Sequence, residues 1–138
     1  MDKIFKFKLL NIIFLQFACG SIFSLYAQNQ IIGYYRVTDP FTQVESKVRL
    51  YKTTAGTYAG EVCWVKDDPN NKYLKYVFLW NLTYDSTDNE YKQGHIKYPG
   101  IPGTYRTFMR FENDSTLKVR GYLGVSALGK TVYWKKEK

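Results

Sequence analysis

YKQGHIKYPGIPGTYRTFMRFENDSTLKVRGYLGVSALGKTVYWKK, residues 91–136, is the stretch that decides the fold. It holds four runs of alternating apolar and polar side chains, separated by Pro-Gly, Asn-Asp and Leu-Gly turn sequences. Alternation with a period of two is typical of a β-strand with one buried face, and short turns of this kind join antiparallel neighbours. The stretch therefore predicts a meander of four strands: Glu90–Tyr98, Thr104–Glu112, Ser115–Leu123 and Lys130–Lys135.

Two of these strands show which side chains should point inward. Because side chains alternate between the two faces of a strand, the apolar set of each run marks the buried face. These sets are Tyr105, Thr107, Met109 and Phe111 in one strand, and Leu117, Val119, Gly121 and Leu123 in the next.

Residues 30–84 supply four more strand candidates: Gln30–Val37, Glu45–Lys52, Thr57–Val65 and Tyr73–Tyr84. The last is long and apolar, so one strand, two strands and a short helix remain alternatives there. Eight short strands without an amphipathic helix of usual length predict an all-β fold, a single antiparallel up-and-down β-barrel, because closure removes exposed sheet edges.

The first 27 residues have the pattern of a signal peptide. Lys3, Lys6 and Lys8 precede an apolar run, and Ala27 is a small residue before the expected cleavage site. We therefore expect residues 1–27 to be a signal peptide and residues 28–138 to be the barrel domain of a periplasmic or secreted protein. A retained membrane anchor and a lipoprotein carrying lipid on Cys19 are the two alternatives.

Net charge and cysteine content limit which binding partners and which disulfides we expect. Removal of 27 residues from 138 takes away three lysines and one aspartate, so the net charge falls from +8 to +6. A basic surface favours anionic neighbours such as lipid head groups, whereas the exported address argues against nucleic acid. Cys63 is then the remaining cysteine, so no internal disulfide is expected.

Several short motifs resemble one family over nearly the whole of residues 28–138. They are Gly33-Tyr34-Tyr35, Tyr58-Ala59-Gly60-Glu61-Val62, Gly94-His95-Ile96-Lys97-Tyr98-Pro99, Gly103-Thr104-Tyr105, Leu117-Lys118-Val119-Arg120-Gly121-Tyr122 and Val132-Tyr133-Trp134. In this order they resemble the domain of unknown function 2147 family of small exported bacterial proteins. The resemblance implies a barrel similar to lipocalins and fatty-acid-binding proteins, and implies no established activity. Tyr35 replaces a usual Trp, and Tyr98-Pro99 stands where the family tends to have Asp-Pro.

A barrel of eight strands is either filled by side chains or wide enough for one small ligand. The side chains that we place inside or at the mouth are Tyr35, Tyr58, Trp64, Tyr105, Met109 and Trp134. They are either core residues or the lining of an interior ligand site. Closure of the last strand against the first would also bring Lys135 or Lys136 over the Tyr35 ring.

Five basic residues should gather on the outer face of neighbouring strands: Lys97, Arg106, Arg110, Lys118 and Arg120. With Phe108 and Tyr122 between them, they could engage an anionic envelope component such as lipid, glycan or protein. An ordinary solvated outer face with cross-strand charge pairs is the competing interpretation.

No catalytic or metal-binding pattern stands out. His95 is the single histidine, and no nucleophile or carboxylate is placed beside it by sequence. Asp67 and Asp68 match no calcium-loop spacing, and one His with one Cys is too few donors for a structural zinc site. We therefore expect a protein without enzyme activity, metal or cofactor, which binds a small apolar or amphipathic molecule in its interior. The alternative is an envelope interaction protein that uses its basic outer face.

Overall fold

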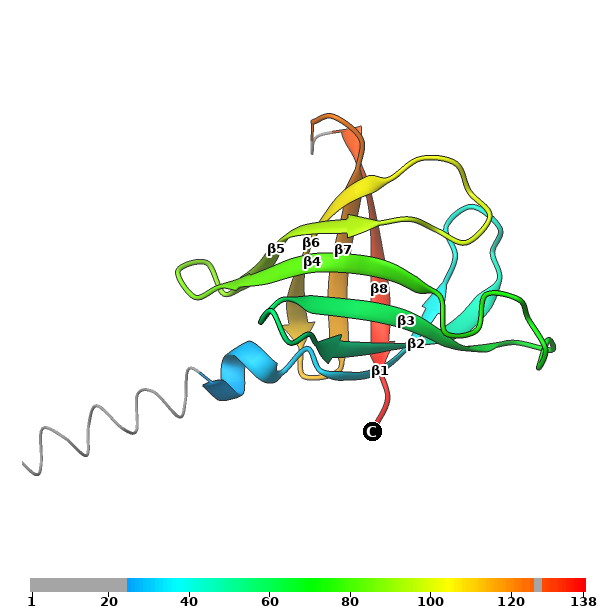
Figure 1. The fold of residues 1–138 in the computed structure, drawn as a ribbon. Coiled ribbons are helices and arrows are strands. Elements are labelled where there is room, and N and C mark those ends of the chain that lie inside the picture. Colours follow the sequence, from blue (N-terminus) through cyan, green and yellow to red (C-terminus); the bar gives the residue numbers. More distant parts are fainter. Residues whose placement is uncertain (1–24, 126–127) are drawn as a thin grey trace, which may run out of the picture. The chain divides into compact units, whose positions relative to one another are not determined.

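The computed structural model describes residues 25–125 and 128–138, and its strands close into an antiparallel barrel in sequence order (Figure 1). The strands are β1 Gly33–Thr38, β2 Glu45–Lys52, β3 Tyr58–Val65, β4 Val77–Asp85, β5 Glu90–Ile96, β6 Tyr105–Asn113, β7 Thr116–Tyr122 and β8 Lys130–Lys136. The predicted all-β, eight-strand up-and-down barrel is therefore confirmed.

A short helix at 25–29 precedes the barrel in the sequence. Residues 1–24 of the predicted signal peptide, with Cys19, lie outside the described residues, so cleavage and lipidation stay predictions. Within the described ranges, no helix combines the length and the apolar character that crossing a membrane requires.

The segment Tyr73–Tyr84 contains one strand preceded by a turn. Lys75 has a φ of 70°, in the left-handed region that interrupts an extended chain. The Lys75 N–H donates to the Val62 carbonyl at 2.7 Å, and the Val62 N–H donates to the Tyr76 carbonyl at 3.1 Å. This turn delays regular strand geometry to Val77, and the helical alternative is wrong.

The inward faces largely follow the predicted alternation. Thr107, Met109, Leu117 and Val119 are buried. Leu123, which was predicted to face inward, is 54% exposed, because β7 ends at Tyr122 and Leu123 lies beyond the strand.

One end of the barrel is filled by side chains. The start of β1, β3, β5 and β7 and the end of β2, β4 and β6 meet there, as antiparallel order requires. The Tyr35 hydroxyl donates to the Ile31 carbonyl at 2.8 Å, and the Tyr58 and Tyr91 rings meet edge to face at 5.7 Å. Met109 is fully buried among them, so we call this half the packed end.

Trp64 lies outside, contrary to the prediction. Val48 pairs with Val62 but Lys47 pairs with Trp64, so Cys63 is an extra residue in a β-bulge. The bulge turns both Cys63 and Trp64 outward, and Trp64 is 37% exposed beneath the Lys47 ammonium.

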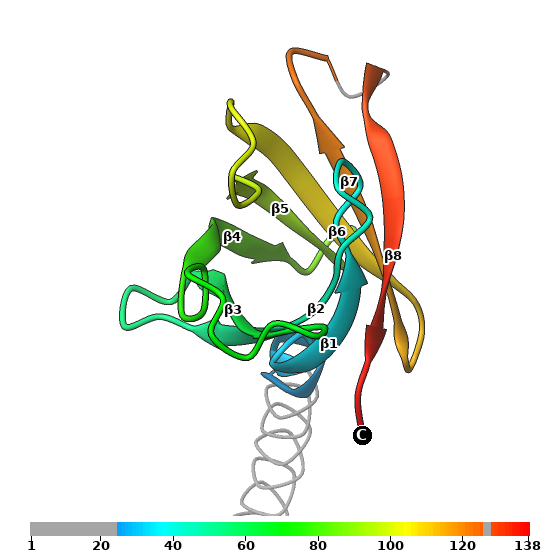
Figure 2. The same ribbon diagram turned by 90° about the vertical axis from the view of Figure 1, so that its right-hand side faces the viewer.

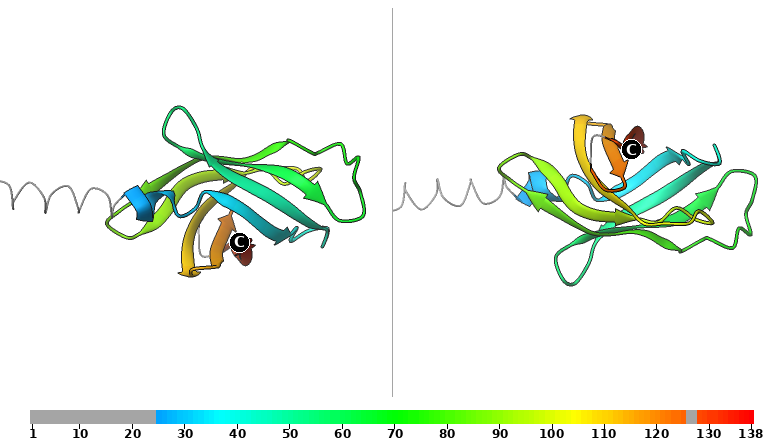
Figure 3. Two further views of the ribbon diagram at one scale, coloured as in Figure 1. Left: turned by 90° about the horizontal axis from the view of Figure 1, so that it is seen from below. Right: turned by 90° about the horizontal axis from the view of Figure 1, so that it is seen from above.

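β8 closes the barrel against β1 (Figure 2, Figure 3). Tyr35 pairs with Lys136, and the Lys136 Nζ lies 6.0 Å from the Tyr35 ring centroid. The expected cation over this ring is therefore confirmed, and burial there lowers the pKa of the Lys136 ammonium.

Candidate functional site

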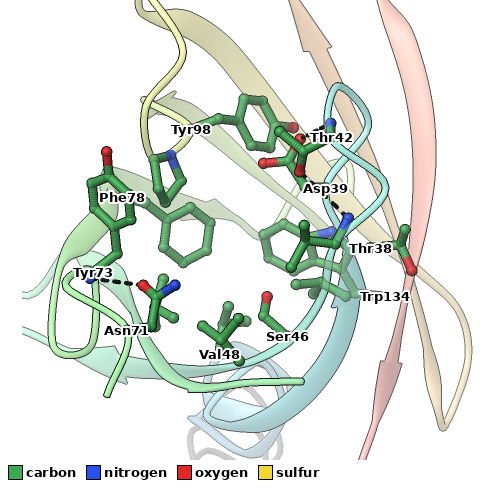
Figure 4. Close-up of a pocket in the computed structure, with 15 residues that line it drawn as sticks. Thr38, Asp39, Thr42, Ser46, Val48, Asn71, Tyr73, Phe78, Tyr98 and Trp134 are labelled. Atoms are coloured by element: carbon green, nitrogen blue, oxygen red, sulfur yellow. Dashed lines mark hydrogen bonds between the residues drawn. The ribbon is translucent and has the colours of Figure 1, made fainter. Parts of the chain in front are cut away.

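A cavity of about 200 Å³ opens at the end of the barrel opposite the packed end. Figure 4 shows Phe78 and Trp134 between Tyr98, Asp39 and Thr42 on one side and Asn71, Ser46 and Val48 on the other. We call the edge at Asp39, Thr42 and Tyr98 the rim. The apolar lining comprises Val37, Val44, Val48, Val62, Val65, Phe78, Pro99 and Trp134, and the polar lining comprises Thr38, Asp39, Thr42, Ser46, Asn71, Tyr73 and Tyr98.

Strand order explains how distant residues meet at this cavity. The end of β1, the start of β2, the end of β3 and the start of β4 reach the same end of the barrel. Trp134 of β8 lies beneath them, with its ring centroid 6.4 Å from Tyr35 and 5.9 Å from Phe78. The indole therefore separates the packed end from the cavity.

Asp39 is fixed at the rim by its own loop. Its Oδ1 accepts hydrogen bonds from the Phe41 N–H at 2.7 Å and the Thr42 N–H at 3.1 Å. Its backbone also bonds to Gln43 and Val44, each at 2.9 Å. Such an Asx turn is favoured by the Asp-Pro sequence and holds the carboxylate in one orientation.

Tyr98 lies at the rim next to this turn, and Figure 4 shows its hydroxyl beside Asp39 and Thr42. Burial, followed by the negative charge of Asp39, raises the pKa of the Tyr98 phenol to about 12. Its ring packs edge-on against Phe41 at 5.4 Å and Tyr105 at 5.9 Å. Tyr98 is therefore a fixed, protonated hydroxyl at neutral pH.

Of the six predicted interior residues, Trp134 lines the cavity. Tyr35, Tyr58 and Met109 are buried in the packed end, and Tyr105 is half-buried at the rim against Phe41. Trp64 is on the outer face. The ligand-binding role of all six stays a prediction.

Sequence reasoning missed most of the lining. By sequence, the Asp39-Pro40 pair indicates only a turn, and Tyr98 only ends a predicted strand. The available signal was positional: loops that follow the odd strands and precede the even strands of an up-and-down barrel share one end. Alternation places Val48 on the apolar face of Glu45–Lys52, but nothing local separates a cavity wall from packed core.

The five basic residues lie on the outer face, but most have partners. Arg110 and Lys118 form ion pairs with Glu90 and Glu112 at 3.4 and 3.8 Å. Lys97 bonds to the Ile101 carbonyl at 3.1 Å and Arg120 to the Thr131 hydroxyl at 2.8 Å. Within the described part of the chain, no hydrogen bond or ion pair engages the Arg106 guanidinium.

Arg106 lies in an outer hollow of about 570 Å³ with His95, Phe108 and Tyr122. The His95 ring stacks on Trp80 at 5.6 Å and 24°. In residues 25–125 and 128–138, no three His, Cys, Asp or Glu residues come together as metal ligands. This face therefore offers aromatic surface and one unpaired guanidinium.

Comparisons with known proteins agree with the fold. The family model described as "Uncharacterized protein conserved in bacteria (DUF2147)" matches residues 33–136. A solved structure, protein HP1028 from Helicobacter pylori, is described as belonging to the lipocalin family. It is 20% identical, with a TM-score of 0.64, over 78% of this chain and 83% of that one. Comparison with curated proteins finds no match.

Proposed function

Because this chain belongs to the DUF2147 family and closes into a lipocalin-like barrel, we propose that it binds a small apolar or amphipathic molecule in the cavity at its open end. The observation that supports this most is the contrast between the two ends. One end is filled by buried side chains, whereas the other leaves about 200 Å³ between apolar walls and a polar rim.

The size of the cavity limits the ligand. Pockets for drug-sized ligands usually measure about 300–1,000 Å³. A cavity of about 200 Å³ therefore suits a smaller molecule, or one chain of a larger molecule whose head stays at the rim.

The binding role proposed here is not enzymatic. The cavity lining contains hydroxyls and one carboxylate but no His, Cys or Lys, so Ser46 has no base of the usual kind beside it. His95 lies on the outer hollow instead.

Displacement of an apolar fluorescent probe tests the interior site. Val62→Phe fills the cavity and is expected to weaken probe binding at least tenfold, whereas Val77→Phe, at a position 41% exposed, leaves it unchanged. Val37→Phe provides a second filling variant, and circular dichroism verifies that each variant folds. Equal probe binding by all of these proteins would contradict the proposal.

A second candidate role is contact with an anionic envelope surface through the outer face. Unpaired Arg106 beside Phe108 and Tyr122 favours it. Retention on anionic vesicles should fall when Arg106, Arg110 and Arg120 are all changed to Gln. The matched control changes the exposed Lys66, Lys72 and Lys75 to Gln. Equal retention of both triple variants would exclude a specific role of this face.

A further inference from the structure

We propose that the cavity selects ligands whose head group is a hydrogen-bond donor, an amine before an alcohol, and discriminates against free carboxylates. This inference rests on the proposed interior binding site and adds the chemical class of its ligand. The observation that supports it is the negative charge at the rim of the cavity.

Asp39 is the one charged residue in the cavity lining, which contains no Lys, Arg or His. One carboxylate oxygen is held by the Phe41 and Thr42 N–H groups. In the described ranges, no hydrogen bond or ion pair engages the other oxygen, Oδ2. The rim thus carries a fixed carboxylate with one oxygen outside the hydrogen bonds of the turn.

The lysines near the rim do not neutralise the negative charge of Asp39. The Lys97 Nζ bonds to the Ile101 carbonyl at 3.1 Å. The Lys72 and Lys130 ammonium groups lie over the Tyr73 and Phe41 rings, 5.2 and 5.9 Å from the centroids, and neither lines the cavity. A carboxylate head would therefore meet Asp39 before it met a cation.

The other polar groups of the lining are compatible with a donor head. Tyr98, Ser46 and Thr42 present neutral hydroxyls, which accept as readily as they donate. An ammonium has three protons to donate, so it can bond to Asp39 and to these oxygens together. An alcohol has one proton to donate, so it can bond in this way to Asp39 but not to the other oxygens as well. A carboxylate has no proton to donate and repels Asp39 across a half-buried rim.

A matched series of octylamine, octanol and octanoate tests the selection by displacement of the same probe at neutral pH and about 0.15 M salt. The cavity has the volume of roughly seven water molecules at about 30 Å³ each, so a medium-length chain is the size to test. We expect octylamine to bind about tenfold more tightly than octanoate, with octanol between them. The net charge of the protein would favour the anion, so it works against this result.

Asp39→Asn removes the charge and keeps an oxygen that can accept the loop N–H groups, so the preference for octylamine should largely disappear. Asp114→Asn, an exposed substitution in the turn between β6 and β7, should leave the preference intact. Equal affinities, a preference for octanoate, or an unchanged preference in Asp39→Asn would overturn the head-group inference alone. Failure of all three compounds and the probe to bind would overturn both this inference and the interior site.

Discussion

Gly94 marks how tightly the residues of β5 fit against their neighbours. A Cβ atom at this position would lie 2.7 Å from the Thr107 Cγ2 and 2.8 Å from the Leu82 Cδ1. Both neighbours are buried, so neither can move aside freely.

We expect Gly94→Ala to lower the free energy of unfolding by about 1–3 kcal/mol, the usual cost of overpacking a core. Gly121→Ala is the matched control, since its nearest contact would be an ordinary 3.9 Å. Urea unfolding of both variants measures the difference, and equal losses would contradict the steric explanation.

Tyr98 should make the free energy of unfolding decrease as the pH rises into the alkaline range. Burial raises its pKa from 10.0 to about 12 in the folded protein. The neutral phenol is thus favoured by folding, so its contribution is complete below pH 10.0 and is lost as the pH rises from there through about 12.

Replacement of Tyr98 by Phe should reduce the loss of unfolding free energy between about pH 9 and pH 11.5. Tyr133→Phe, at a position 54% exposed, serves as the control for removal of a phenol. Urea midpoints at the two pH values give the comparison. A Tyr98→Phe protein with the full wild-type loss would show that this group does not titrate as described.

At the scale of the element, the bulge in β3 turns Trp64 toward water. Trp64 is 37% exposed whereas Trp134 is 2% exposed, although both belong to strands with inward apolar faces. We expect Trp64→Phe to lower the fraction of fluorescence that acrylamide quenches, and Trp134→Phe to raise it. The reverse pattern would mean that β3 lacks the bulge at Cys63.

The seam between β1 and β8 is the shortest ladder of the barrel. These strands pair at Tyr35 and Arg36, whereas β1 pairs with β2 along all of Gly33–Thr38. The Glu137 N–H continues the seam by donating to the Tyr34 carbonyl at 2.8 Å. Its carboxylate lies 3.2 Å from the Lys47 ammonium.

Amide hydrogen exchange should therefore be faster at Glu137 than at Val119 in the centre of β7. Glu137→Gln should accelerate exchange at the seam, while Glu112→Gln, which removes the pair with Lys118, should not. Uniform exchange around the barrel would show that the seam is as stable as the other ladders.

At the scale of the whole molecule, the predicted export gives a mass that can be measured. If residues 1–27 are a signal peptide, the exported protein begins at Gln28 and has the mass of residues 28–138. We expect Ala27→Asp to block this cleavage and Cys19→Ser to leave the exported mass unchanged. An added lipid mass that Cys19→Ser abolishes would instead identify a lipoprotein.

The sequence alone determined the all-β class, the order of the strands and most of their inward faces, whereas the structure decided that Tyr73–Tyr84 holds one strand. Alternation and turn residues are local signals, and an antiparallel meander pairs each strand with the next, so local order becomes spatial order. Met109, Leu117 and Val119 are buried as their spacing predicts.

Only the tertiary structure decided where the barrel is hollow. Trp64 turned outward because one extra residue in β3 shifts every later side chain, and alternation by itself does not reveal a bulge. Asp39 and Tyr98 are far apart in the sequence and meet because closure brings loops of separate hairpins to one rim. A cavity exists where the side chains of several strands together do not fill the interior, so no single segment of the sequence can reveal it.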